Sequence, residues 1–241
     1  TQGLLLCGIA DCSGQAFAAV SLLGAGAGAA STLLLARNGV TSGQGAAINS
    51  GTIWGFWFGI TAQAAIEMDD NASLATVMAG AAGFTGVGIL LAHSARPTAG
   101  QVSMANSGGL WAGVVTALLL ATSDSDDDQT FFAIEIGATG AGIVSLAILS
   151  RSISVSRGRM LLIDAGGILG GLLGATATYL VAGDNSGDAI LVGSAAGVVG
   201  GLVLATHLTR DFDAPGTGPQ AMLTPTLMGR DGAGMALVGR F

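Results

Sequence analysis

The sequence predicts an all-α integral membrane protein of about seven glycine-rich transmembrane helices, and composition and hydropathy patterning carry that prediction. Hydrophobic residues make up 51% of the 241 positions and charged residues only 10%, whereas soluble domains carry about 25% charged residues. Seven apolar stretches of about 18 to 23 residues follow one another, close to the length that crosses a bilayer as a helix. They cover residues 16–36, 45–66, 72–92, 102–121, 131–149, 160–182 and 189–206.

Glycine is the second anomaly, with 41 residues against only 4 prolines. Many glycines recur every fourth residue inside the apolar stretches, which places them on one face of a helix. Small residues let neighbouring helices approach closely in lipid, so we expect these faces to pack helices, with a pore-lining stripe as the alternative. The expected packing residues are Gly51, Gly55, Gly59, Gly109, Gly113, Gly166, Gly170, Gly174, Gly193 and Gly197.

A repeat of about 57 residues organises the chain. Thr41–Gln44 recurs as Thr98–Gln101 and loosely as Ser156–Arg159, and Trp54 recurs as Trp111. The first two segments predict a capping box, in which the Thr hydroxyl and the Gln amide bond each other's backbone N–H. In the third, arginine replaces glutamine, so we expect the reciprocal bond to be lost.

The repeat predicts units of helix, basic turn, helix and acidic loop. The predicted parts are an N-terminal segment 1–14, a bundle 15–210 and a tail 211–241, with repeat units at about 16–70, 71–128 and 129–188 and a half unit at 189–210. The seventh helix would then lack a partner in its own chain, which favours a homo-oligomer. Because the sequence begins at Thr1 rather than Met, we expect a removed leader or a longer N-terminal region before it.

The connections alternate in charge, which predicts that basic turns share one side of the membrane and acidic loops the other. Representative positions are Arg37, Arg96 and Arg157 against Asp70, Asp126 and Asp184. The aspartates at 124–128 and 184–188 could hold Ca²⁺, a cation that prefers carboxylate oxygens. They lack the spacing of an EF-hand loop, so a solvated acidic loop is favoured.

Four polar residues fall inside the apolar stretches. They are Asn49, Asn106 and Asp164, which occupy one repeat position, and Glu135. An ionisable residue within a membrane span is a functional-site hypothesis by default. One interpretation is hydrogen bonding between helices, with Asp164 paired to Arg157 or Arg159 and Glu135 partly buried or reaching the surface. The other is a proton or ion relay.

Enzyme, cofactor and nucleic-acid roles find no support. No Ser–His–Asp or Cys–His set can be assembled, and the Gly-rich run at 137–142 lies within an apolar stretch rather than after a strand, so it does not predict a nucleotide site. The net charge of −7 argues against a nucleic-acid surface. Cys7 and Cys12 could form a disulfide in an exported protein or remain free thiols, and no cluster of metal ligands accompanies them.

The tail has a different composition. Residues 211–220 predict a linker, and Asp231-Gly232 between two apolar runs predicts a β-hairpin. The ending on Phe241, with Met235 and Leu237 before it, resembles the C-terminal signature of bacterial outer-membrane proteins. That resemblance implies an outer-membrane location, although the helices depart from the β-barrel of that class. An inner membrane is the alternative.

These observations favour a non-enzymatic structural or scaffold protein that contacts membrane lipids and self-associates through glycine-rich helices. The alternative is a channel or transporter with a polar path near Asn49, Asn106, Asp164 and Glu135. A structural protein needs only packing faces and satisfied polar groups. A transport protein needs at least one polar group left available to its cargo.

Overall fold

The structure is a computed structural model that describes residues 39–66, 68, 70–123, 127–183, 186–213, 220–228 and 232–240. Side chains are described in the bundle as far as residue 213, apart from those of residues 70 and 71. The first predicted helix, 16–36, lies outside the described residues. So do Cys7, Cys12, Arg37, Asp126, Asp184 and Phe241.

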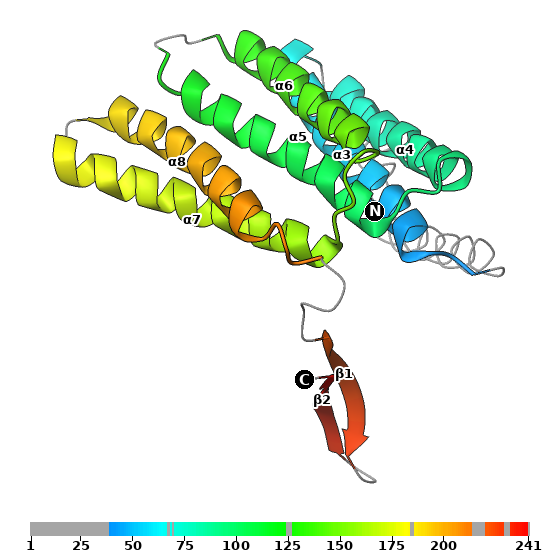
Figure 1. Ribbon diagram of the computed structural model, residues 1–241. Coiled ribbons are helices and arrows are strands. Elements are labelled where there is room, and N and C mark those ends of the chain that lie inside the picture. Colours follow the sequence, from blue (N-terminus) through cyan, green and yellow to red (C-terminus); the bar gives the residue numbers. More distant parts are fainter. Residues whose placement is uncertain are drawn as a thin grey trace.

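Six helices in the described residues match the other six apolar stretches (Figure 1). They are α3 (Ser42–Ile66), α4 (Asp70–Ser94), α5 (Ala99–Leu120), α6 (Asp128–Leu149), α7 (Arg157–Ala182) and α8 (Gly187–Leu208). Five of them, α4 to α8, are long and apolar enough to cross a membrane. Helix α3 is as long as α4 but is not among the five, because Asn49, Ser50 and Thr52 interrupt its apolar run.

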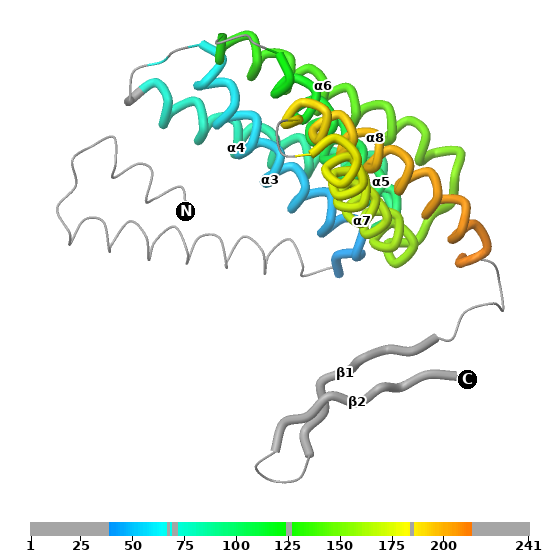
Figure 2. The backbone as a smooth tube through the Cα atoms, turned by 90° about the vertical axis from the view of Figure 1, so that its left-hand side faces the viewer, coloured from blue at the N-terminus to red at the C-terminus, as the bar shows by residue number. Residues whose placement is uncertain are grey.

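The helices form a row of three antiparallel pairs, α3 with α4, α5 with α6, and α7 with α8 (Figures 1 and 2). Each pair is joined at the end that carries the acidic loops, and turns at 95–98 and 150–156 join successive pairs at the other end. Helix α5 is central, since it contacts both α3 and α7. Among the described helices, the first pair makes no contact with the third.

The pairing corrects the predicted phase of the hairpins. We expected each basic turn to join paired helices, yet α4 does not pack along α5 and α6 does not pack along α7. The expectation of an unpaired seventh helix is also wrong, because α8 packs along the whole of α7. The turn chemistry marks where the chain reverses but does not determine which helices fit closely.

Glycine determines the fit inside each pair. Gly170 and Gly197 face each other so closely that a Cβ on either would overlap the other's carbonyl oxygen. The same is true of one glycine pair in each of the other two hairpins. Those pairs are Gly55 with Gly80 and Gly108 with Gly142. Backbones in such contact gain dispersion energy that lipid chains cannot supply.

The turns before α5 and α3 form the capping boxes that the sequence predicts. Thr98 N donates to Gln101 Oε1 at 2.9 Å, and Gln101 N donates to Thr98 Oγ1 at 3.2 Å, which confirms the predicted capping box. The equivalent bonds at Thr41 and Gln44 are 3.0 and 3.2 Å. The glutamine side chain also donates to the carbonyl end of the partner helix, in the second hairpin to Ser150 O at 3.1 Å.

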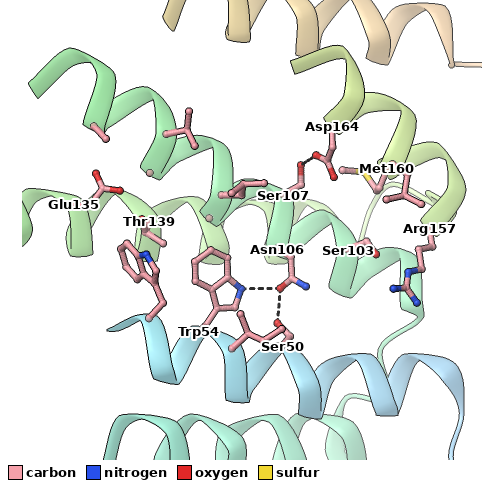
Figure 3. A pocket seen from close by; sticks show the side chains of 18 residues that line it. Ser50, Trp54, Ser103, Asn106, Ser107, Glu135, Thr139, Arg157, Met160 and Asp164 are labelled. Atoms are coloured by element: carbon pink, nitrogen blue, oxygen red, sulfur yellow. Dashed lines mark hydrogen bonds between the residues drawn. The ribbon is translucent and has the colours of Figure 1, made fainter. Parts of the chain in front are cut away.

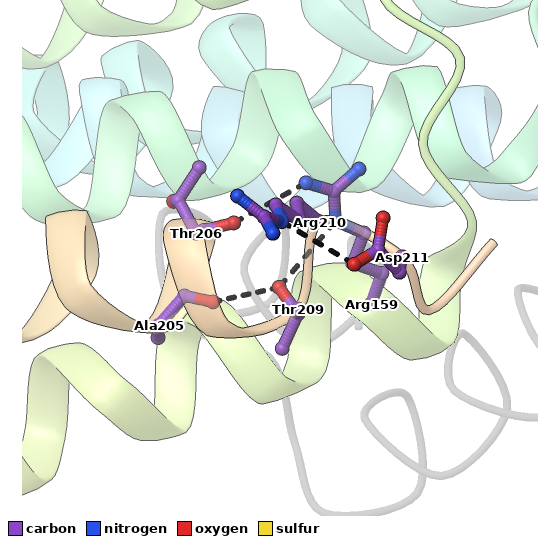
Figure 4. Close-up of polar contacts among 6 residues, drawn as sticks. All are labelled: Arg159, Ala205, Thr206, Thr209, Arg210 and Asp211. Carbon is purple, nitrogen blue, oxygen red and sulfur yellow. Dashed lines mark hydrogen bonds and ion pairs between the residues drawn. The ribbon is translucent and has the colours of Figure 1, made fainter. Parts of the chain in front are cut away.

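The third turn loses the reciprocal bond as predicted and replaces it. Ser156 Oγ accepts from Arg159 N at 3.1 Å, while Ser156 N donates to Asp213 Oδ2 at 2.9 Å. The Arg159 guanidinium instead bonds the end of α8, at Thr209 Oγ1 (3.4 Å) and Thr206 O (3.3 Å) (Figure 4). Arginine thus ties α7 to α8 where glutamine ties the earlier pairs.

Beyond the bundle, β1 (Gln220–Met228) and β2 (Gly232–Arg240) pair as antiparallel strands. The register runs from Gln220 opposite Arg240 to Met228 opposite Gly232. These two strands form the only sheet in the described residues.

Candidate functional site: a polar seam and an intramembrane cavity

A hydrogen-bonded seam joins each helix pair to the next. Ser50 Oγ and Trp54 Nε1 on α3 donate to Asn106 Oδ1 on α5, at 2.5 and 2.9 Å (Figure 3). One repeat later, Ser107 Oγ donates to Asp164 Oδ1 on α7 at 2.5 Å. Trp111 Nε1 on α5 donates to the same oxygen at 2.8 Å. One side-chain oxygen therefore serves two donors at each junction.

The spacing of the donors explains the seam. Serine and tryptophan stand four residues apart on both α3 and α5, so their polar atoms share one helix face. Helix α5 plays both roles through adjacent residues, with Asn106 accepting from α3 and Ser107 donating to α7. Buried polar groups in lipid need partners within the protein, and each seam satisfies three of them at once.

The predicted polar residues do not all lie in the seam. Asn106 and Asp164 lie in it, whereas Asn49, at the same repeat position, is exposed on α3. The predicted pairing of Asp164 with an arginine is wrong: in the described bundle no ion pair joins it to Arg157 or Arg159. The reason is that Ser107 and Trp111 already occupy its Oδ1, and Arg159 is held by α8.

The serine and tryptophan donors were not predicted as a site. A single serine or tryptophan in an apolar stretch gives no sign of its partner. The usable signal was that the Ser-x-x-x-Trp spacing at Ser50 and Trp54 recurs 57 residues later, one position away from the predicted acceptors.

The seam borders a cavity of about 540 Å³ between α3, α5, α6 and α7 (Figure 3). Asn106 and Asp164 line it together with Glu135 and Thr139 from α6, so three of the four predicted polar residues meet there. Arg157, which is exposed at the start of α7, lines it at the basic end of the bundle. Such volumes are typical of small-molecule sites, about 300 to 1,000 Å³.

Glu135 is the unusual group in this cavity. Only 7% of the residue is exposed, which excludes the predicted alternative that it reaches the surface. It lies seven residues into α6, about 10 Å along the helix axis at about 1.5 Å per residue. Its Oε2 and the Oγ1 of Thr139 are buried without a hydrogen-bond partner among the described residues.

Gly113 makes room for both side chains. A Cβ at this glycine would lie 2.7 Å from Glu135 Oε1 and 2.8 Å from Thr139 Oγ1. The side-chain oxygens of Glu135 and Thr139 therefore both lie against Gly113, where α5 has no side chain. Gly109, four residues earlier, instead faces Trp54 of α3 and Ile143 of α6.

The remaining predicted packing glycines lie between paired helices. Gly51, Gly55 and Gly59 face α4, and the other five lie between α7 and α8. These five are Gly166, Gly170, Gly174, Gly193 and Gly197. Each would bring a Cβ against the partner helix, in most cases against its backbone.

At the acidic end, Asp127 acts as the N-cap of α6. Its Oδ1 accepts from Gln129 N at 3.1 Å and Thr130 N at 3.2 Å, and Thr130 Oγ1 donates to its Oδ2 at 2.5 Å. The hydroxyl bond from Thr130 is the largest cause that holds the pKa of this carboxyl below its ordinary value. No group of three His, Cys, Asp or Glu residues in the described part of the chain could hold a metal ion.

The chain matches no protein-family model, and neither the curated proteins nor the solved structures include a significant match to it.

Proposed function

We propose that this chain is a non-enzymatic structural protein of a membrane, built as a row of repeated helix hairpins that self-associates. The observation that carries the proposal is the seam, in which Ser50, Trp54 and Asn106 bond one another as Ser107, Trp111 and Asp164 do one repeat later. The polar groups of the seam thus hold neighbouring helix pairs together.

The repeat unit we propose is the pair of helices joined by an acidic loop, followed by a basic turn. Its phase follows the contacts of α3 with α4, α5 with α6 and α7 with α8. On α7, Ala165 and Leu169 stand where α5 has its serine and tryptophan donors, and Leu169 is 60% exposed. The row thus ends in an apolar face suited to lipid.

Because α8 is paired with α7, we attribute self-association to the tail. Two paired strands alone are marginally stable in water, and their open edges invite pairing with another chain. A second copy with the same tail supplies a complementary edge. The bacterial outer membrane remains our proposed location, on the resemblance of the tail, with the inner membrane as the alternative.

Deletion of residues 221–241 tests self-association. We expect the full chain to form an oligomer in mild detergent and the shortened chain to be monomeric, as measured by light scattering coupled to size-exclusion chromatography. Circular dichroism of the shortened chain checks that the helices persist. A full chain that is already monomeric contradicts the proposal.

The cavity around Glu135 favours a second candidate, a channel or transporter. A membrane-buried carboxyl group that finds no hydrogen-bond partner among the described residues is a feature that packing does not explain. Flux of protons or organic cations into vesicles that contain the purified protein would support this candidate if Glu135→Gln abolishes it. Absence of flux with the wild type excludes it.

A further inference from the structure

We propose that the cavity beside Glu135 binds an organic cation with an apolar body, such as a substituted ammonium ion, with the Glu135 carboxylate as its counter-ion. The inference goes beyond the structural role and does not depend on it. It starts from two facts: Glu135 Oε2 and Thr139 Oγ1 have no partner in the described bundle, and both residues line a cavity of about 540 Å³.

The charge of the ligand follows from the charges around the carboxyl group. A buried, unpaired carboxylate is strongly disfavoured, so the group must be neutral or must hold a cation. The other ionisable side chains that line the cavity are Asp164 and Arg157, both on α7. Asp164 is held by Ser107 and Trp111, and Arg157 is exposed at the basic end, so neither compensates Glu135.

The apolar body follows from the rest of the lining. The indoles of Trp54 and Trp57 line the cavity with aliphatic side chains such as Leu110 and Met160. Aromatic faces attract cations, and indole does so best. Ile53 and Leu110, which are 57% and 48% exposed, lie at the lining where it meets the outer surface of the bundle. A ligand dissolved in the bilayer could therefore enter the cavity from the lipid, between the helices.

A metal ion fits this site less well. Hard cations such as Ca²⁺ take about six to eight oxygen ligands. The oxygens nearest Gly113 are those of the Glu135 carboxylate and the Thr139 hydroxyl, and no group of three His, Cys, Asp or Glu residues forms in the described part of the chain. An ammonium ion needs only one counter-ion and a few acceptors.

Binding exchanges the proton of the Glu135 carboxyl group for the organic cation, so the net charge of the site stays the same. In the empty site the carboxyl group carries its proton. When the cation enters, the O–H bond breaks, the proton leaves to water, and the carboxylate pairs with the cation. Binding should release about one proton per site, because a buried pair is tolerated where a lone charge is not.

Calorimetric titration of the full chain with tetraphenylphosphonium, in an uncharged detergent, tests the inference. The same titration in buffers of different ionisation enthalpy counts the released protons. We expect one saturable site per chain and release of about one proton.

Glu135→Gln should weaken binding by at least about tenfold, equivalent to about 1.4 kcal/mol, and should abolish proton release. Asp128→Asn, an exposed change on the same helix, should alter neither the affinity nor the proton release.

Gly113→Ala separates binding from folding. Its methyl group would overlap the side-chain oxygens of Glu135 and Thr139 and meet no other atom of a neighbouring helix closer than 3.8 Å, so we expect weakened binding, and thermal unfolding in parallel checks that the variant still folds. Equal affinity of the Glu135→Gln variant, equal binding of uncharged triphenylphosphine oxide, displacement by Na⁺ alone, or no saturable binding by the wild type would each overturn the inference. None of these outcomes bears on the oligomeric state, so the structural proposal stands or falls separately.

Discussion

At the scale of single residues, one acceptor oxygen determines how neighbouring hairpins meet. Asn106 and Asp164 perform the same task at successive junctions, one as a neutral amide and the other as a carboxyl group. The seam therefore requires an oxygen acceptor and not a charge. The sequence places both residues at one repeat position and repeats the Ser-x-x-x-Trp spacing beside it, but it does not show that each acceptor takes its donors from the preceding helix pair.

Replacing Asp164 tests this requirement. Asp164→Asn should unfold close to the wild-type temperature, because Asn106 already accepts two donors in the same geometry. Asp164→Ala should lower stability by about 1 kcal/mol or more, because it leaves Ser107 and Trp111 unpaired in the membrane, where such bonds contribute roughly 0.6 to 1.7 kcal/mol each. Thermal unfolding in mild detergent measures both. Equal losses in the two variants would show that an amide cannot replace the carboxyl group at this junction.

Asp127 predicts a pH effect confined to the start of α6. Its folded pKa lies below the ordinary 3.8, chiefly because of the Thr130 hydroxyl bond. A lowered pKa stabilises the cap above about pH 4, and the stabilisation is lost as the pH falls through the folded pKa. Amide exchange at Gln129 and Thr130 should therefore accelerate at pH 3 relative to an Asp127→Asn variant, which cannot titrate. Parallel behaviour of the two proteins between pH 6 and pH 3 would contradict this.

At the scale of helices, close glycine contacts decide which neighbours pair. Gly197 of α8 faces Gly170 of α7, whereas Gly200, three residues further on, has open space where a Cβ would stand. The same contrast occurs on α4 between Gly80, which faces Gly55, and Gly83. Spacing predicted that glycine faces pack, but it could not identify the partner, because every apolar stretch carries such a face. The pairing across acidic loops emerged only from the three-dimensional fit.

These neighbouring glycines provide matched variants. Gly197→Leu should destabilise the bundle by about 1 to 3 kcal/mol or more, since overpacking forces α7 and α8 apart. Gly200→Leu should have a much smaller effect, because a Cβ at Gly200 meets nothing within 4 Å. On α4, Gly80→Leu and Gly83→Leu repeat the comparison. The melting temperatures in detergent rank the four, and equal values within a pair would argue against backbone contact at these glycines.

At the scale of the whole molecule, the sequence predicted the helices better than their arrangement. Apolar length located all six described helices to within about three residues of their ends, since lipid demands such stretches. Three polar residues of the cavity, Asn106, Glu135 and Asp164, were also predicted, because polar groups stand out in an apolar chain. The depth of Glu135 and the bare surface at Gly113 depend on how α5 and α6 pack, and no local pattern encodes that.

Sidedness is the consequence of the topology that is easiest to test. Because consecutive helices are antiparallel, the turns at 95–98 and 150–156 lie at one end of the row, and the connections near Ser123 and Asp188 lie at the other (Figure 1). Single cysteines at Arg151 and Asp188, both exposed positions, are introduced into a chain whose Cys7 and Cys12 have been replaced by serine. In sealed vesicles a membrane-impermeant maleimide should label one of them before lysis and the other only after it. A cysteine at Ser123 should be labelled from the same side as the cysteine at Asp188, because both positions lie at the acidic end.

Labelling of Arg151 and Asp188 from the same side would mean that the hairpins do not cross the bilayer. The row would then have to lie along the membrane surface, where its exposed leucines on α7 could not all face lipid.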